Sequence, residues 1–183
     1  MKFFLSILLV IVFIVLIVTL HLGIAYVLPF PWNKINIIFA AIIIALVWFQ
    51  SGLTVWVTAA VYLFIEVYTP VPFGVNLLAS TVSILGVYWL SKEFVTNTSW
   101  YSVFGMTAIG LFVYRVLYTL LLAIIYAIEG IHTLPLGELS VLYVWEMGLT
   151  TVFSIVVYTG LQFIGGKRKK ESKTLLWKNI SQQ

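Results

Sequence analysis

The chain has 183 residues, of which 62% are hydrophobic and 9% are charged, and its mean hydropathy is +1.11. Soluble domains carry roughly 25% charged residues, so this composition excludes an ordinary soluble protein and indicates one embedded in a membrane. The sequence contains no Cys and no Asp, which excludes disulfides, thiolate metal sites and thiol nucleophiles. At about 20 residues per transmembrane helix the length allows about six spans, and we therefore predict an all-α bundle of about six transmembrane helices.

Apolar runs separated by short polar or proline-containing turns predict the spans, which are about 3–28, 35–49, 53–69, 73–90, 100–128 and 139–164, followed by a basic tail over 165–183. The first run is longer than the apolar core of a secretory signal, about 7–15 residues, so we interpret it as an uncleaved helix. His21 within it is interpreted as a side chain that reaches the membrane interface, not as a metal ligand. The prolines of Leu28-Pro29-Phe30-Pro31 break the helix, and they place Trp32 and Lys34 where interfacial anchors belong.

Polar residues recur about one helical turn apart in the later spans, and residues four apart share a helix face. The stripes are Thr54, Thr58, Tyr62 and Glu66 in the third span, Asn76, Ser80 and Ser83 in the fourth, and Tyr143, Glu146, Thr150, Ser154 and Tyr158 in the sixth. Lipid cannot satisfy such groups, so we expect these three spans to face one another, joined by the fifth. The first two spans lack a stripe and are expected on the lipid-facing or partner-facing side.

Four residues form a predicted intramembrane polar cluster: Glu66, Asn76, Arg115 and Glu146. A charged side chain in the membrane costs about 2.5–3.5 kcal/mol on insertion scales, so Arg115 requires a partner, which is Glu66 or Glu146. The cluster is open to two interpretations. One is a polar pocket or relay that faces outward, and the other, which we favour, is a structural ion pair that fixes how the helices dock.

Basic residues indicate the orientation, because they are enriched on the cytoplasmic side of a membrane. With six spans, Lys2, Lys92 and the tail share one side and Lys34 lies on the other, so we expect both termini in the cytoplasm. The tail contains the cluster Lys167, Arg168, Lys169 and Lys170. Each basic residue beside anionic lipid contributes about 1 kcal/mol, so we interpret the tail as a lipid anchor. One short run makes no extended basic face, and no nucleic acid partner is expected.

The sequence carries no recognisable catalytic motif. It contains neither a G-x-S-x-G nucleophile motif nor an H-E-x-x-H zinc motif, and it has no adjacent glutamates, so serine hydrolases and metalloproteases are not indicated. We therefore expect a protein that is not an enzyme and that holds no cofactor or metal.

The segment from Asn36 to Tyr118 resembles the MreD family of rod-shape-determining membrane proteins. It contains an aliphatic span, the turn L-F-I-E-V-Y-T-P-V-P-F-G-V-N, and a further span that ends Y-W-L-S-K-E-F-V-T-N-T-S-W-Y-S. In that family an acidic residue, commonly Asp, precedes a Pro-Phe-Gly turn. The matching positions are Glu66, Pro72, Phe73 and Gly74, with Glu in place of the commoner Asp.

The resemblance implies a non-enzymatic component of the cell-wall elongation machinery in the bacterial cytoplasmic membrane. Its implied partners are MreC, the actin-like MreB, and a RodA-type glycosyltransferase with its penicillin-binding transpeptidase. MreD proteins are also similar in architecture to the substrate-binding subunits of energy-coupling-factor vitamin transporters, which supply the alternative function. A scaffold needs an exposed surface for its partners, whereas a transporter subunit needs a pocket with convergent polar groups.

Overall fold

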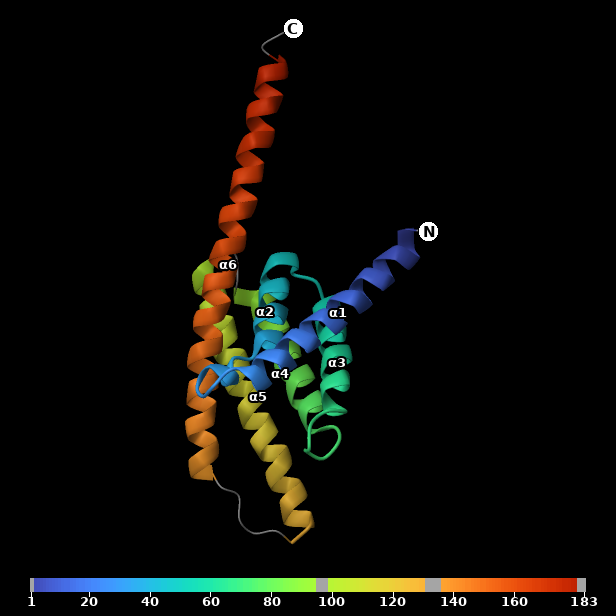
Figure 1. Ribbon diagram of the computed structural model, residues 1–183, viewed down its shortest axis with the longest axis vertical. Coiled ribbons are helices and arrows are strands. Elements are labelled where there is room, and N and C mark those ends of the chain that lie inside the picture. The colour runs from blue at the N-terminus through green and yellow to red at the C-terminus, as the bar shows by residue number, and fades with distance from the viewer. Residues whose placement is uncertain (1, 95–98, 131–135, 181–183) are drawn as a thin grey trace.

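The computed structural model describes the backbone of residues 2–94, 99–130 and 136–180, and the side chains of residues 11–93, 99–130 and 137–164. This part of the chain is entirely helical, with six α-helices, one short 3-10 helix and no strand (Figure 1). The elements are α1 (Lys2–Val27), η1 (Trp32–Lys34), α2 (Ile37–Phe49), α3 (Leu53–Glu66), α4 (Val75–Phe94), α5 (Trp100–Ile128) and α6 (Leu136–Ile180).

The helix ends lie within four residues of the predicted spans, except that α6 continues to Ile180. Two helical segments, α5 and the Gly137–Ile164 part of α6, are long and apolar enough to cross a membrane. Helices α2 and α3 have 13 and 14 residues, fewer than the roughly 20 that cross the hydrocarbon core of a bilayer. The all-helical prediction is confirmed, and the six-span arrangement stays a prediction.

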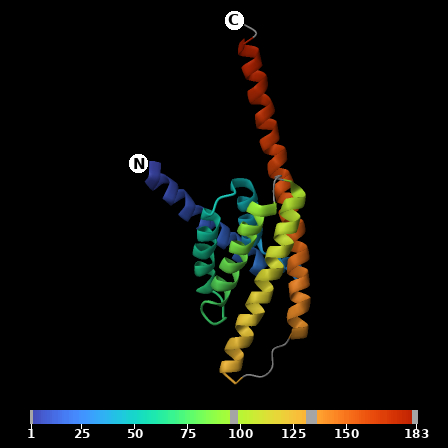
Figure 2. The same ribbon diagram turned by 180° about the vertical axis from the view of Figure 1, so that it is seen from behind.

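Helices α2 to α6 run alternately up and down, while α1 crosses them obliquely (Figure 1). The start of α1 and the end of α6 point toward the same end of the bundle, opposite the turn between α3 and α4. Figure 2 shows from behind that the hairpin of α5 and α6 extends beyond this turn. Within the described residues, α3 packs against α4, α4 against α5 and α5 against α6.

Helix α2 occupies the centre of the bundle, and the prediction that it lies on the outside is wrong. Nine of its thirteen residues are buried, and it contacts each of the other five α-helices. A helix that is hydrophobic all round suits the interior of a protein as well as lipid, so composition could not separate the two. Helix α1 does lie at the periphery, since only Ile14, Ile17 and Val18 are buried among its described side chains.

The stripe residues of α3, α4 and α6 are buried as expected, apart from the half-buried Tyr143, but these helices do not all face one another. Helix α6 packs on α2 and α5, and within the described residues it has no contact with α3 or α4. Several hydroxyls bond to their own helix instead, as Thr58 Oγ1 does to the Thr54 carbonyl and Ser154 Oγ to the Thr150 carbonyl, both at 2.7 Å. A polar stripe therefore marks a buried face here, and it does not by itself identify the helix that packs against that face.

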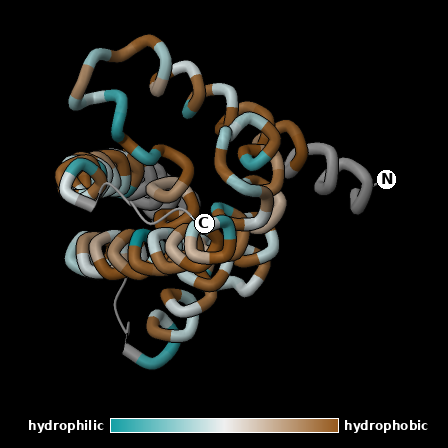
Figure 3. Tube along the Cα trace, turned by 90° about the horizontal axis from the view of Figure 1, so that it is seen from below, coloured by the Kyte–Doolittle hydropathy of each residue, from teal (hydrophilic) through white to brown (hydrophobic). Residues whose placement is uncertain are grey.

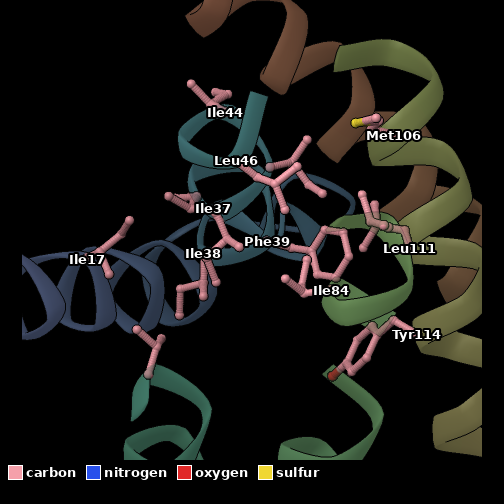
Figure 4. Packing of buried hydrophobic residues seen from close by; sticks show 14 of the residues in the cluster. Ile17, Ile37, Ile38, Phe39, Ile44, Leu46, Ile84, Met106, Leu111 and Tyr114 are labelled. Carbon is pink, nitrogen blue, oxygen red and sulfur yellow. The ribbon is translucent and has the colours of Figure 1, made fainter. Parts of the chain in front are cut away.

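The helices pack closely where α5 crosses α2 and α4. Figure 4 shows the ring of Phe39 directed from α2 toward the side chains of α4 and α5. A Cβ atom at Gly110 would lie 2.9 Å from Val87 Cγ2 and 3.0 Å from the Phe39 ring. Ser83 Oγ donates to the Gly110 carbonyl at 2.6 Å. A glycine at this position therefore lets three helices approach closely.

The outer surface of the bundle is apolar. Figure 3 shows hydrophobic residues on the outward faces of the helices as well as between them. Large side chains such as Trp56, Trp89, Phe112 and Val144 are exposed on α3, α4, α5 and α6. Soluble monomers rarely expose contiguous apolar area on this scale, so the surface agrees with the membrane environment that the composition indicates.

Candidate functional site

Glu66, the last residue of α3, caps the N-terminus of α4. Its carboxylate is 4% exposed; Oε1 accepts the backbone N–H groups of Gly74 and Asn76 at 2.8 and 3.2 Å, and Oε2 accepts that of Leu77 at 2.8 Å. The first N–H groups of a helix lack intrahelical acceptors, and the helix dipole favours a negative charge there. Glu66 therefore holds the turn between α3 and α4 closed.

The turn itself is built from the family-like residues. Gly74 has φ of +99°, a conformation that glycine adopts without a steric cost, and Pro72 O accepts the N–H of Val75 at 3.4 Å. Phe73 stands at the tip and is 73% exposed. The turn is thus fixed from within, while its two aromatic side chains, Tyr68 and Phe73, are exposed.

Arg115 forms its ion pair with Glu146, not with Glu66. Arg115 Nη2 contacts Glu146 Oε2, and the guanidinium lies 4.8 Å from the ring centroids of Tyr114 and Tyr143 and 5.3 Å from that of Tyr118. Aromatic rings attract a cation at such distances. Of the two partners predicted for Arg115, the structure selects the one on α6, because Glu66 is already bound to the start of α4.

Asn36, which the sequence analysis did not single out, joins α2 to this ion pair. Its Nδ2 donates to Glu146 Oε1 at 3.0 Å, its backbone N–H donates to Thr150 Oγ1 at 2.8 Å, and its Oδ1 accepts the Phe39 N–H at 3.0 Å. Asn is a preferred residue at a helix N-cap. The signal that could have found it is an Asn immediately before an aliphatic run and after a proline-containing turn.

Asn76 enters the cluster through Tyr114. The Tyr114 hydroxyl donates to Asn76 Oδ1 at 3.2 Å, and the backbone N–H of Asn76 is bound by Glu66. The four predicted residues therefore form two hydrogen-bonded groups, Glu66 with Asn76 and Arg115 with Glu146. The consecutive residues Tyr114 and Arg115 on α5 bring the two groups side by side.

A cavity of about 260 Å³ lies beside this cluster, and we call it the polar cavity. Its lining residues come from η1, from the N-cap of α2 and from the other five α-helices. They include His21, Lys34, Tyr62, Asn76, Arg115 and Glu146. His21 and Lys34, which we predicted at the membrane interface, both line this cavity. The reason is that α1 crosses the bundle obliquely and brings η1 against α6.

Five residues that line the polar cavity each carry a buried polar atom without a hydrogen-bond partner: His21 Nδ1, Asn33 Oδ1, the Tyr62 hydroxyl, Asn76 Nδ2 and Arg115 Nε. Leaving a buried polar group unsatisfied costs about 1–3 kcal/mol. Five such atoms around one cavity indicate that it is filled by water or by a polar ligand. The described residues contain no group of three or more His, Asp or Glu residues that could hold a metal ion.

The backbone of residues 165–180 continues α6 as a helix, but the side chains of Lys167, Arg168, Lys169 and Lys170 lie outside the described residues. Comparison with known proteins finds no match to this chain among protein-family models, curated proteins or solved structures.

Proposed function

We propose that this chain is a non-enzymatic scaffold of the bacterial cell-wall elongation machinery, similar to MreD, that crosses the cytoplasmic membrane six times. The observation that carries the proposal is the turn after α3. Its family-like residues form one closed unit, in which Glu66 binds three backbone N–H groups and Phe73 is left exposed at the tip. A rigid turn with exposed aromatic side chains, Phe73 at 73% and Tyr68 at 64%, suits a protein contact, because aromatic residues are enriched among the residues that dominate binding energy.

The interior of the bundle also supports a scaffold. The one ion pair among the described residues is internal, and the Glu146 carboxylate binds Arg115 with one oxygen and Asn36 with the other. These contacts tie α2, α5 and α6 together. A polar group that fixes the arrangement of helices is a structural element, as a scaffold requires, and it leaves the outer surface for partners.

The proposed topology places both termini in the cytoplasm and the turn around Phe73 on the outer side. It is supported by the basic tail and by the start of α1 and the end of α6 pointing to one end of the bundle. Reporter fusions at Gln183 and within residues 131–137 should report opposite sides of the membrane. Fusions that report the same side would contradict the six-span arrangement.

The proposed partner is an MreC-like protein, and the turn supplies the test. We expect the protein to recover an MreC-like protein when purified from gently solubilised membranes, and Phe73→Ala to reduce that recovery at least tenfold. Phe112→Ala, which removes an equally large exposed ring from the side of α5, is the control and should recover the partner normally.

Depletion of the protein should round rod-shaped cells, which tests the function apart from the turn. If Phe73→Ala and Phe112→Ala recover equal amounts of the MreC-like protein, the turn is not part of the contact surface. Normal cell shape and no MreC-like partner would contradict the scaffold altogether.

A second candidate, the substrate-binding subunit of an energy-coupling-factor type vitamin transporter, is favoured by the polar cavity. Such a subunit requires a pocket with a few convergent polar groups, and the polar cavity has them. Loss of vitamin uptake with normal cell shape after depletion would support this candidate. A neighbouring gene for a coupling ATPase would do so as well, whereas an MreC-like neighbour would support the scaffold.

A further inference from the structure

The unpartnered donors of the polar cavity converge on one kind of ligand group. Glu146 engages Arg115 through Nη2 and leaves Nε free, and Tyr114 occupies Asn76 Oδ1 and leaves Nδ2 free. Lys34 adds an ammonium group whose charge no carboxylate of the described residues pairs. All three groups are hydrogen-bond donors. Asn76 is only 6% exposed, so bulk solvent does not readily supply an acceptor for its Nδ2.

The charge around the cavity is positive. Among its lining residues Lys34 and Arg115 are cations and Glu146 is the one carboxylate, so with His21 neutral two positive charges and one negative charge leave a net charge of +1. A carboxylate carries one negative charge and only accepts hydrogen bonds, and it binds the N–H groups of an arginine at short distances. It therefore fits both the charge and the donors.

The unpartnered Asn33 Oδ1 requires the opposite chemistry. An amide oxygen accepts hydrogen bonds, so the ligand needs a hydrogen-bond donor in addition to its carboxylate. The cavity volume of about 260 Å³ is below the roughly 300–1,000 Å³ of pockets for drug-sized ligands. The ligand is therefore a small molecule with few heavy atoms.

We propose that the polar cavity binds a small hydroxycarboxylate or similar carboxylate with a hydrogen-bond donor, its anionic group held by Arg115, Asn76 and Lys34. This binding goes beyond the scaffold function and does not depend on it, because it concerns the isolated chain. In a scaffold the bound carboxylate would have a structural or regulatory role. If no carboxylate binds, the results expected of the partner experiments do not change.

The test uses the full chain purified in detergent, with glycolate as the probe. Glycolate should raise the thermal unfolding midpoint in a saturable way, as ligand binding to the folded state requires. Glycolamide has the same size and no charge, and sodium chloride matches the ionic strength, so neither should give a saturable rise. Phosphate should bind more weakly than glycolate.

Variants then assign the binding to the polar cavity. Lys34→Gln removes the unpaired charge from a partly exposed side chain and should raise the dissociation constant for glycolate at least tenfold. Lys92→Gln, at the far end of α4 and over the ring of Tyr88, should leave it unchanged. Acetate lacks the hydroxyl group that would donate to Asn33 Oδ1, so the wild-type protein should bind glycolate more tightly than acetate. Asn33→Leu should abolish this preference.

Four results would overturn the proposal. They are a glycolate effect no larger than that of chloride, equal binding of glycolamide, a preference for phosphate, and an unchanged dissociation constant in Lys34→Gln. The first of these would leave the polar cavity filled by water alone.

Discussion

The capping contacts of Glu66 make a sharp prediction about stability. Glu66→Ala removes the acceptor of three backbone N–H groups at the start of α4. Glu66→Gln keeps the shape and one oxygen, which can still accept from Gly74 and Asn76, but loses the charge and the acceptor for Leu77. The alanine variant should therefore lose more stability than the glutamine variant.

The size of the loss follows from the two effects that the carboxylate combines. A capping acceptor contributes about 0.5–2 kcal/mol, and a negative charge at a helix N-terminus adds up to about 2 kcal/mol in a partly buried site. Because Glu66 is 4% exposed, water does not readily replace it. We expect Glu66→Ala to lower the free energy of unfolding by about 2–4 kcal/mol, and Glu66→Gln by about half as much.

The measurement is unfolding of the detergent-solubilised protein by sodium dodecyl sulfate, followed by circular dichroism. Glu129→Ala, at an exposed carboxylate just after α5, is the control and should change little. Glu66→Ala combined with Arg115→Leu should lose the sum of the two single losses, because Arg115 pairs with Glu146. A wild-type-like Glu66→Ala, or a double variant that recovers stability, would refute the capping assignment.

Three further sets of variants probe the packing, the ion pair and the turn, each by the same unfolding measurement. Gly110→Ala should cost about 1–3 kcal/mol, because its Cβ would overlap the side chains packed against α5. Gly105→Ala on the same helix meets no atom within 4 Å and should be neutral or slightly stabilising; equal effects would contradict the close packing. Arg115→Leu and Glu146→Leu should each cost about 3–5 kcal/mol because each leaves a buried charge, and the double variant should lose clearly less than their sum. Gly74→Ala should cost more than about 1 kcal/mol because φ is positive there, and an unchanged stability would show that the turn adopts another conformation.

The helices themselves could be predicted well from the sequence. Apolar runs and the prolines and glycines between them are local features, and the helix ends lie within four residues of the predicted ranges apart from the continuation of α6. The burial of polar residues was also predictable, since Glu66, Asn76 and Glu146 lie on faces that lipid could not satisfy. Local chemistry was sufficient for both.

The arrangement of the helices was not predictable in the same way. The aliphatic α2 was expected on the outside and lies at the centre, because lipid and a protein interior select the same side chains. Likewise, α6 was expected against α3 and α4 but packs on α2 and α5. A hydroxyl that bonds to its own helix backbone is satisfied wherever the helix lies, so its stripe carries no information about the neighbour.

The sequence by itself determined the all-helical class, the helices and the set of polar residues that are buried, because these depend on composition and short-range pattern. Only the tertiary structure decided which carboxylate pairs with Arg115. Glu66 and Glu146 are equivalent in sequence terms, but Glu66 ends its helix beside the free N–H groups of α4, while Glu146 faces α5 and the N-cap of α2. The tertiary structure also decided where the polar cavity lies. The cavity is formed where the oblique α1 and η1 meet the bundle, and no local sequence pattern indicates this contact.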